Sequence, residues 1–364
     1  MRTGAGVAAI EEVLQGADVL GRLVHAITED TADMSSIPGV PTTILVAPDS
    51  FKGTLTAAEV AAAIGRGLEQ RGRPVDLCPI ADGGEGTFEA LVQALGGERH
   101  TATVSDPLGR PVEAMFALSD GGVGILEMAA ASGLGLVEPG DRNAIAASTS
   151  GTGELILAAI EAGAEVVYLG VGGSATTDGG AGAIQAIRDG GGLQGARIVV
   201  LSDVRTPFEH AARVFAPQKG ADERAVAQLT KRLNDQARRL ARDPRGRPMT
   251  GAAGGLSGGL WAEFGAELMP GAQFILDAIG FDRRMRAARA VVTGEGKLDE
   301  QSLAGKLVSE IATRARQSGV PCYAIVGKRE LDSFGERVLD LQVVLEAGTP
   351  AQLRAAGKRL AKVI

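Results

Sequence analysis

The chain has 364 residues, of which 45% are hydrophobic and 22% are charged, a balance typical of a globular protein with room for two domains. The formal net charge is −7 and aromatic residues make up only 3%, which argues against nucleic-acid binding because that needs clustered cations and stacking rings. Without an 18-residue apolar run or a secretory pattern, we expect neither a membrane span nor a signal peptide. The two cysteines lack metal-ligand or disulfide spacing, which fits a reducing cytoplasm.

Residues 1–42 are expected to form an N-terminal extension. Apolar residues recur at helical spacing between positions 10 and 27, and a polar linker with two prolines follows. The helix that this pattern predicts could pack on the main body or on a second subunit, so a homodimer is left open. A poorly ordered tail is the alternative.

Strand and helix patterns alternate after this extension. The predicted strands lie at 44–47, 75–80, 101–104, 112–118, 122–128, 165–170, 197–202, 288–293, 322–326 and 342–345. The predicted helices lie at about 56–70, 85–95, 152–162, 178–188, 222–242, 271–279, 304–317 and 350–362. The alternation predicts a doubly wound parallel sheet, and a turn signal at 106–110 predicts a hairpin in a second α/β unit with a mixed sheet.

Unusual loops follow several of the predicted strands, and the carboxyl ends of strands are where ligands of open α/β sheets bind. Asp49 and Ser50 open the first of these loops, whose backbone amides would attract an anion with help from Lys52. Asp82 and Glu85 are spaced by glycines in the second loop, where they could hold Mg²⁺ or substrate hydroxyls. Ordinary capped turns are the alternative at both places.

A glycine-rich run at 170–180 follows the strand predicted at 165–170. Its start matches the relaxed dinucleotide pattern, but a lone match is weak. The run continues into hydroxyl groups and Asp178, which suit phosphate and Mg²⁺ better than a nicotinamide cofactor. We therefore expect phosphate contacts from four residues of the run, Gly172, Gly173, Ser174 and Thr176.

Four further residues are candidates for the site. Asp203 follows a strand and could hold a metal or a substrate hydroxyl, with helix capping as the alternative. Lys219 lies in a Pro-Gln-Lys-Gly loop and could hold a phosphoryl group, and Glu295 and Asp299 follow the strand at 288–293. Such loops of carboxylates, lysines and glycines fit phosphoryl transfer, which depends on positioning and on charge neutralisation.

Two other signals carry less weight. Glu127 ends an apolar strand and must be paired or hydrated. The Gly-x-Ser-x-Gly pattern around Ser257 would suit a hydrolase nucleophile, but that arrangement needs a later histidine, and all three histidines precede Ser257. A hydrolase triad in that order is excluded.

Taken together, the loops resemble those of the bacterial glycerate kinases of glycolate and sugar-acid catabolism, over about residues 43–364. The motifs that carry the resemblance, in chain order, lie at 47–55, 80–87, 172–182, 203–204, 217–221, 251–256 and 293–296. Each is weak alone, but seven in order are specific. The sequence departs from the family pattern at Thr177, at Ser202 and at Arg205-Thr206-Pro207, and the changes within 202–207 could retune the acceptor pocket.

The resemblance implies transfer of phosphate from ATP, with Mg²⁺, to D-glycerate, and a product that is 2-phosphoglycerate in preference to 3-phosphoglycerate. It also implies two α/β domains with the active site in the cleft between them. We place the boundaries at 43–84 plus 286–364 for a discontinuous domain and at 85–285 for the domain inserted into it.

We expect the catalytic and metal-binding groups among the acids and lysines of these motifs. Asp82, Asp178, Asp203 and Lys52 are the candidates for catalysis, and Asp178 and Asp203 are the candidates for Mg²⁺. The remaining expected contacts to substrate or phosphate come from Asp49, Ser50, Glu85, Gly172, Gly173, Ser174, Thr176, Lys219, Glu295 and Asp299. A nicotinamide-dependent oxidoreductase of a small hydroxy acid, and an inactive ligand-binding relative, are the alternatives.

Overall fold

The computed structural model of the protein describes residues 42–51, 53–304 and 306–364. The helix predicted between positions 10 and 27 and the candidate Lys52 lie outside the described residues. Residues 43–364 form one compact unit. No helix among the described residues is long and apolar enough to cross a membrane.

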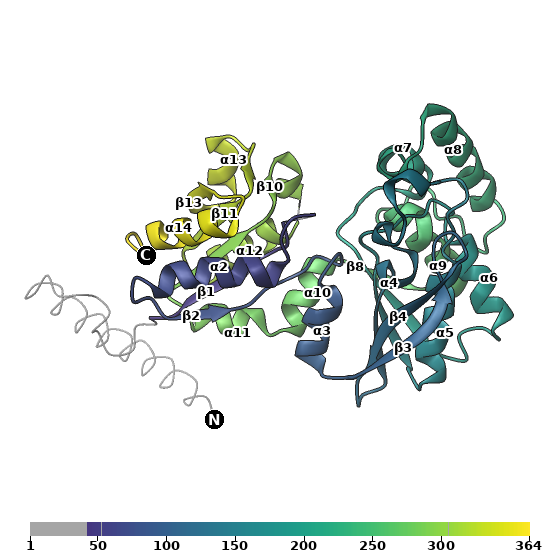
Figure 1. Ribbon diagram of the computed structural model, residues 1–364, viewed down its shortest axis with the longest axis horizontal. Coiled ribbons are helices and arrows are strands. Elements are labelled where there is room, and N and C mark those ends of the chain that lie inside the picture. Colours follow the sequence, from purple (N-terminus) through teal and green to yellow (C-terminus); the bar gives the residue numbers. More distant parts are fainter. Residues whose placement is uncertain (1–41, 52, 305) are drawn as a thin grey trace, which may run out of the picture. The chain divides into compact units, whose positions relative to one another are not determined.

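A five-stranded parallel sheet, with strand order β13-β11-β9-β1-β2, is built from the two ends of this unit (Figure 1). Its strands are β1 (Ile44–Pro48), β2 (Val75–Leu77), β9 (Ala290–Gly294), β11 (Cys322–Val326) and β13 (Leu341–Glu346). Strands β1, β9 and β11 are buried along their whole length, as continuous apolar runs covered on both faces should be.

Alternate residues of β1 face two different helical layers. Ile44 and Val46 pack with α2 (Ala57–Glu69) and α14 (Pro350–Leu360), whereas Leu45 and Ala47 pack toward α11 (Phe281–Arg286) and α12 (Leu307–Gln317). Helix α2 begins at a capping box in which Thr56 accepts from the Glu59 amide and Glu59 accepts from the Thr56 amide.

A six-stranded mixed sheet, with order β3-β4-β5-β6-β7-β8, is built from the middle of the chain. Its strands are β3 (Glu98–Ser105), β4 (Pro111–Leu118), β5 (Val123–Glu127), β6 (Val166–Gly170), β7 (Arg197–Leu201) and β8 (Glu267–Met269). The first three strands pair antiparallel and β5 to β8 pair parallel, so the predicted hairpin and mixed sheet are confirmed.

Helices cover both faces of the mixed sheet. On one side lie α3 (Thr87–Leu95) and α10 (Gly271–Ala278), and on the other lie α5 (Ser150–Glu161), α6 (Ala181–Asp189) and α9 (Leu256–Phe264). The remaining elements are the long helix α8 (Glu223–Ala237), three short helices, a two-stranded ladder and six 3-10 turns: α4 (Ala129–Ser132), α7 (Ala211–Phe215), α13 (Ser333–Val338), β10 (Lys297–Leu298), β12 (Lys328–Arg329), η2 (Leu134–Leu136), η3 (Pro139–Asp141), η4 (Phe208–His210), η5 (Pro217–Lys219), η6 (Ala252–Gly255) and η7 (Glu300–Ala304).

One hydrophobic core is shared by the two sheets. It joins Leu45 of β1 to Ile125 of β5 and Leu201 of β7 through α3, α10 and α12. The chain therefore has the predicted α/β class, with one parallel and one mixed sheet. Strands β8, β10 and β12 and helices α4, α7, α9, α11 and α13 were not predicted, and α8 ends at Ala237, before the predicted end at 242.

Candidate active site

Two pockets meet at Asp82 and Lys306, because both residues line both pockets. The first pocket measures about 480 Å³ and lies where β1, β9 and β11 end. The second measures about 530 Å³ and lies where β6 and β7 end. This is the strand edge at which open α/β sheets bind ligands.

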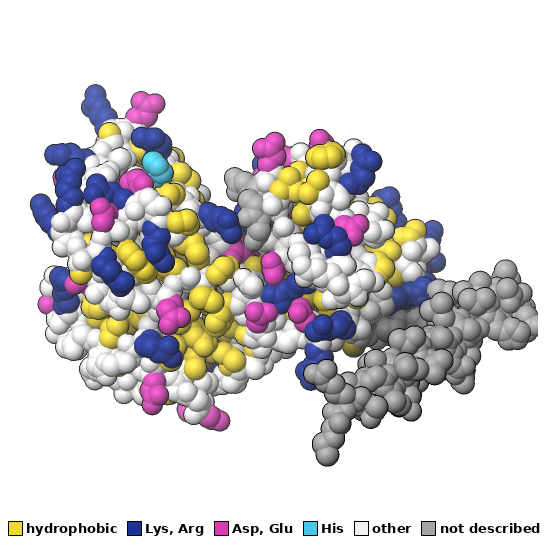
Figure 2. Space-filling view, turned by 180° about the vertical axis from the view of Figure 1, so that it is seen from behind, with side chains coloured by type: hydrophobic (Ala, Val, Ile, Leu, Met, Phe, Trp, Pro, Cys, Tyr) yellow, Lys and Arg dark blue, Asp and Glu magenta, His cyan; other side chains and the backbone are white. Residues whose placement is uncertain are grey.

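The first pocket gathers five of the predicted site residues: Asp49, Ser50, Asp82, Glu295 and Asp299. Three lysines, at positions 297, 306 and 328, line the same pocket. Lys297 lies 2.8 Å from the Glu330 carboxylate and 3.4 Å from the Asp299 carboxylate. Cations and anions are also interspersed over the face of the molecule shown in Figure 2.

The second pocket combines acidic, basic and apolar walls. Of the predicted residues it contains Asp82, Gly172 and Asp203. Gly83, Gly84, Ser202, Arg205, Thr206, Gln218 and Lys306 add polar groups, and Val171, Val204, Val214 and Phe215 add apolar ones. Glu85 is exposed and lines neither pocket.

The backbone of the loop that contains Asp82 packs against the ends of β6 and β7. The Gly172 amide donates to the Gly83 carbonyl at 3.1 Å, and the Gly84 amide donates to the Asp82 carboxylate at 3.1 Å. A Cβ at Gly172 would lie 2.3 Å from the Cα of Gly84, and a Cβ at Gly83 would lie 2.5 Å from the Leu201 carbonyl oxygen. These two glycines therefore allow a close approach of backbone to backbone.

Asp203 follows β7 and accepts from the Ala272 amide at 3.2 Å, so it caps α10 as well as lining the second pocket. Burial, with a further contribution from the charge of Asp82, raises the pKa of the Asp203 carboxyl to about 7. A bound cation would offset the repulsion between these two carboxylates.

The acidic groups of the second pocket fit Mg²⁺. The described residues contain no group of three or more side chains suited to hold a metal ion. Mg²⁺, however, is commonly held by one or two carboxylates together with substrate phosphates. Asp203, beside Asp82, meets that requirement.

Asp178 is not brought to either pocket. It is 1% exposed, and its carboxylate accepts from the Thr149 amide and hydroxyl at 2.9 and 2.8 Å and from the amides of Gly180 and Gly182 at 3.1 Å. Three of these hydrogen bonds end on Oδ2 and one on Oδ1, so the carboxylate is engaged by neighbouring backbone and Thr149 away from both pockets.

Lys219 is also internal. It is 1% exposed, and its amine donates to the Ser174 hydroxyl at 2.8 Å and to the Thr176 carbonyl at 2.5 Å. Burial lowers the pKa of Lys219 to about 7. The fully buried Thr176, with Gly173, Ser174 and Lys219, lines neither pocket.

Two weaker sequence signals have structural explanations. Glu127 accepts from the Phe88 amide at 2.8 Å at the start of α3, and burial raises its pKa. Ser257 is fully buried on α9 and donates to the Met249 carbonyl at 2.6 Å.

Several pocket residues were given no role from the sequence. Lys306 is the N-cap residue of α12, and Lys328 comes two residues after the end of β11. Ligands often bind at helix starts and strand ends, so the positions of both lysines in the sequence could have indicated them. Arg205, Thr206 and Gln218 carry no comparable signal, because only the tertiary fold brings them to the second pocket.

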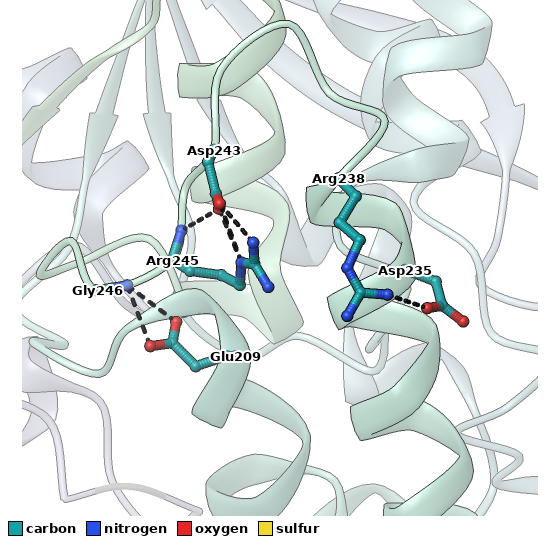
Figure 3. A network of polar contacts seen from close by, with 6 residues as sticks. All are labelled: Glu209, Asp235, Arg238, Asp243, Arg245 and Gly246. Atoms are coloured by element: carbon teal, nitrogen blue, oxygen red, sulfur yellow. Dashed lines mark hydrogen bonds and ion pairs between the residues drawn. The ribbon is translucent and has the colours of Figure 1, made fainter.

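A polar segment between α8 and η6 contacts Thr206, which lines the second pocket. Its Gly251 amide donates to the Thr206 carbonyl at 2.8 Å. Arg242 and Arg247 each lie 4.6 Å from the centroid of the Trp261 ring. Figure 3 shows three further contacts of this region: Arg245 with Asp243, the Gly246 amide with Glu209, and Arg238 with Asp235.

The protein has an α/β fold with two joined pockets at strand ends. The chain belongs to the glycerate kinase family, whose model matches residues 44–189 and 191–353.

Relatives with known names agree with this family. A glycerate kinase from Halalkalibacterium halodurans is 40% identical over 323 residues, which cover 78% of this chain and 85% of the relative. A glycerate 2-kinase from Escherichia coli K12 is 38% identical over 322 residues, with 78% and 84% covered. A crystal structure from Salmonella typhimurium LT2, assigned as glycerate kinase 2, is 33% identical with a TM-score of 0.72 and covers 88% of this chain and 98% of its own.

Proposed function

We propose that the protein is an ATP-dependent kinase that phosphorylates D-glycerate with Mg²⁺, preferentially at the 2-hydroxyl. The observation that carries the proposal is the family match over nearly all of the described residues. The name of the Escherichia coli relative, glycerate 2-kinase, supports the position of phosphorylation. The proposal also places the protein in the cytoplasm.

The two joined pockets suit a reaction between two substrates. In the reaction, the glycerate hydroxyl oxygen forms a bond to the γ-phosphorus of ATP, the bond from that phosphorus to the β–γ bridging oxygen breaks, and the hydroxyl proton leaves. We assign one substrate to each pocket and the transferred group to the junction at Asp82 and Lys306.

The junction residues have distinct proposed roles. The Lys306 ammonium neutralises charge on the transferring phosphoryl group, and Asp82 orients the acceptor hydroxyl and accepts its proton. Asp203 would hold Mg²⁺, which when bound neutralises phosphate charge. Asp49, Ser50, Glu295 and Asp299 line the first pocket and would contact its substrate there. Lys52 stays a candidate on sequence grounds.

We also propose that residues 43–84 with 286–364 form one domain and that residues 85–285 form a second domain inserted into it, with the active site between them. Strand membership supports this division, since the parallel sheet takes its strands from the first set and the mixed sheet takes its strands from the second. The run at 170–180 packs against the Asp82 loop through Gly172, which favours a structural use of its glycines over dinucleotide binding.

An ADP-release assay with D-glycerate tests the function, and direct consumption of the product by enolase separates 2-phosphoglycerate from 3-phosphoglycerate. Asp82→Asn and Lys306→Met should each lower kcat by about 10²- to 10³-fold. Lys231→Met changes an exposed lysine of α8 that lines neither active-site pocket and serves as the control. Near-normal turnover in both junction variants would contradict the assignment.

The division into two substrate pockets has its own test. Lys328→Ala alters the first pocket and Gln218→Ala alters the second, and both side chains are exposed. Each change should raise the KM of a different substrate by about tenfold, the effect of losing roughly 1.4 kcal/mol of binding. If both changes raised the same KM, the pockets would not divide the substrates.

A further inference from the structure

We propose that Lys219 is a positioning residue whose buried amine fixes two walls of the second pocket without touching either substrate. This inference rests on the proposed kinase function and refines it, since a lysine in such a motif would otherwise be assigned to phosphate.

The first step in the argument is where Lys219 lies. It ends η5 directly after Gln218, and Gln218 lines the second pocket. The amine donates to the Ser174 hydroxyl and the Thr176 carbonyl, which follow Gly172 closely in the chain, and Gly172 also lines that pocket. The lysine thus joins the two segments that carry Gln218 and Gly172.

Backbone hydrogen bonds also hold the segment that Lys219 contacts. The Leu134 amide donates to the Gly173 carbonyl at 2.8 Å, and the Ala175 amide donates to the Ser132 carbonyl at 2.9 Å. These bonds join the segment to residues 132–134. The amine of Lys219 supplies the side-chain contact that ties the segment to the wall containing Gln218.

The surroundings of the amine suit a structural role. A lysine that binds phosphate must present its ammonium to the ligand, but Lys219 is 1% exposed and its amine points to a hydroxyl and a carbonyl. Burying a charge is costly, and burial lowers the pKa of Lys219 although the charge of Asp178 acts to raise it. The amine donates to both acceptors, so its N–H groups are engaged inside the protein and not by a ligand.

Steady-state kinetics of Lys219→Met separates positioning from direct catalysis. We expect kcat/KM to fall by about 10- to 100-fold, because the residues that line the second pocket are displaced. Most of this fall should come from an increase in one KM, the same KM that Gln218→Ala raises. Lys231→Met, the same change at an exposed site on α8, should leave both constants unchanged. Loss of kcat with both KM values unchanged would overturn the inference.

A double-mutant cycle with Ser174→Ala provides a second and milder test. If the amine acts by holding the Ser174 hydroxyl, Ser174→Ala alone raises the same KM, and the double variant is no worse than Lys219→Met alone. A normal KM in Ser174→Ala would overturn the inference even if Lys219→Met did not fold, and additive losses would overturn it where all variants fold. A wild-type protein that released no ADP with glycerate would instead overturn the proposed function and this inference together.

Discussion

The carboxylate of Asp178 ties the start of α6 to Thr149, the N-cap of α5. Because it is buried and accepts four hydrogen bonds, Asp178→Ala should lower the free energy of unfolding by roughly 2–4 kcal/mol. Asp178→Asn keeps one acceptor oxygen and should cost less. Urea denaturation measures both changes.

The matched control for this prediction is Asp189→Ala, an exposed aspartate at the end of the same helix, α6, which should change stability by about 0.5 kcal/mol or less. An Asp178→Ala protein that kept full stability but lost all activity would restore Asp178 as a metal ligand.

The buried amine of Lys219 should make stability depend on pH. Its folded pKa is about 7 against an ordinary 10.5, so between these values the unfolded chain binds a proton that the folded chain does not. Stability of the wild type relative to Lys219→Met should therefore rise with pH above 7, by about 2–3 kcal/mol between pH 7 and 9. Chemical denaturation across that range checks it, and a flat difference would show that the amine stays charged.

At the scale of single residues, the sequence predicted which loops reach the pockets better than which side chains do. Asp49, Asp82, Asp203 and Glu295 come directly or shortly after strands, and the carboxyl edge of a sheet is exposed to ligand. Asp178 and Lys219 were predicted from similar loops, but both are buried and form hydrogen bonds inside the protein. Composition cannot distinguish a side chain that binds a ligand from one that satisfies the loop's own backbone.

At the scale of elements, the contact between the Asp82 loop and the end of β6 depends on Gly172. Gly172→Ala would place a Cβ 2.3 Å from the Cα of Gly84, so the Asp82 loop must move and kcat/KM should fall by about 10²-fold. Gly135→Ala, where an added Cβ meets nothing within 4 Å, should be neutral. Normal kinetics in Gly172→Ala would mean that the loop contact does not position Asp82.

Arg242 and Arg247 lie over the ring of Trp261, the only tryptophan in the chain. Tryptophan fluorescence therefore reports on the segment between α8 and η6. Arg247→Ala should shift this fluorescence and cost about 0.5–1 kcal/mol of stability, since one cation–π contact is lost. Arg238→Ala removes an exposed ion pair with Asp235 (Figure 3) and should leave the fluorescence unchanged. An unchanged spectrum in Arg247→Ala would contradict the stacking.

The errors in the predicted elements have local causes. The helix predicted to 242 ends at Ala237 because the residues that follow turn back to contact Trp261, a tertiary effect that a charged helical pattern does not reveal. Helix α9 was not predicted because Gly258 and Gly259 lower its helix propensity. Both glycines are close-packed: a Cβ at Gly259 would lie 2.2 Å from the Gly179 carbonyl oxygen.

At the scale of the whole molecule, the alternating pattern predicted parallel and mixed sheets but not their strand order. The chain leaves the first sheet after β2 and returns to it at β9, which pairs with β1. That pairing joins segments about 245 residues apart, and no local signal in the sequence specifies it.

Because the two sheets share one core, we predict that residues 43–364 unfold as one cooperative unit. Leu45 and Ala47 of the parallel sheet belong to the same buried cluster as Ile125 and Leu201 of the mixed sheet, so exposing one side removes packing from the other. Calorimetry should show a single main transition for this part of the chain, with equal calorimetric and van't Hoff enthalpies. Either substrate should raise the midpoint temperature of this transition, because a ligand stabilises the folded state that binds it. Each pocket includes Asp82, which follows β2, and Lys306, which begins α12. Two resolved transitions, with only one of them shifted by each substrate, would show instead that the sheets are energetically independent.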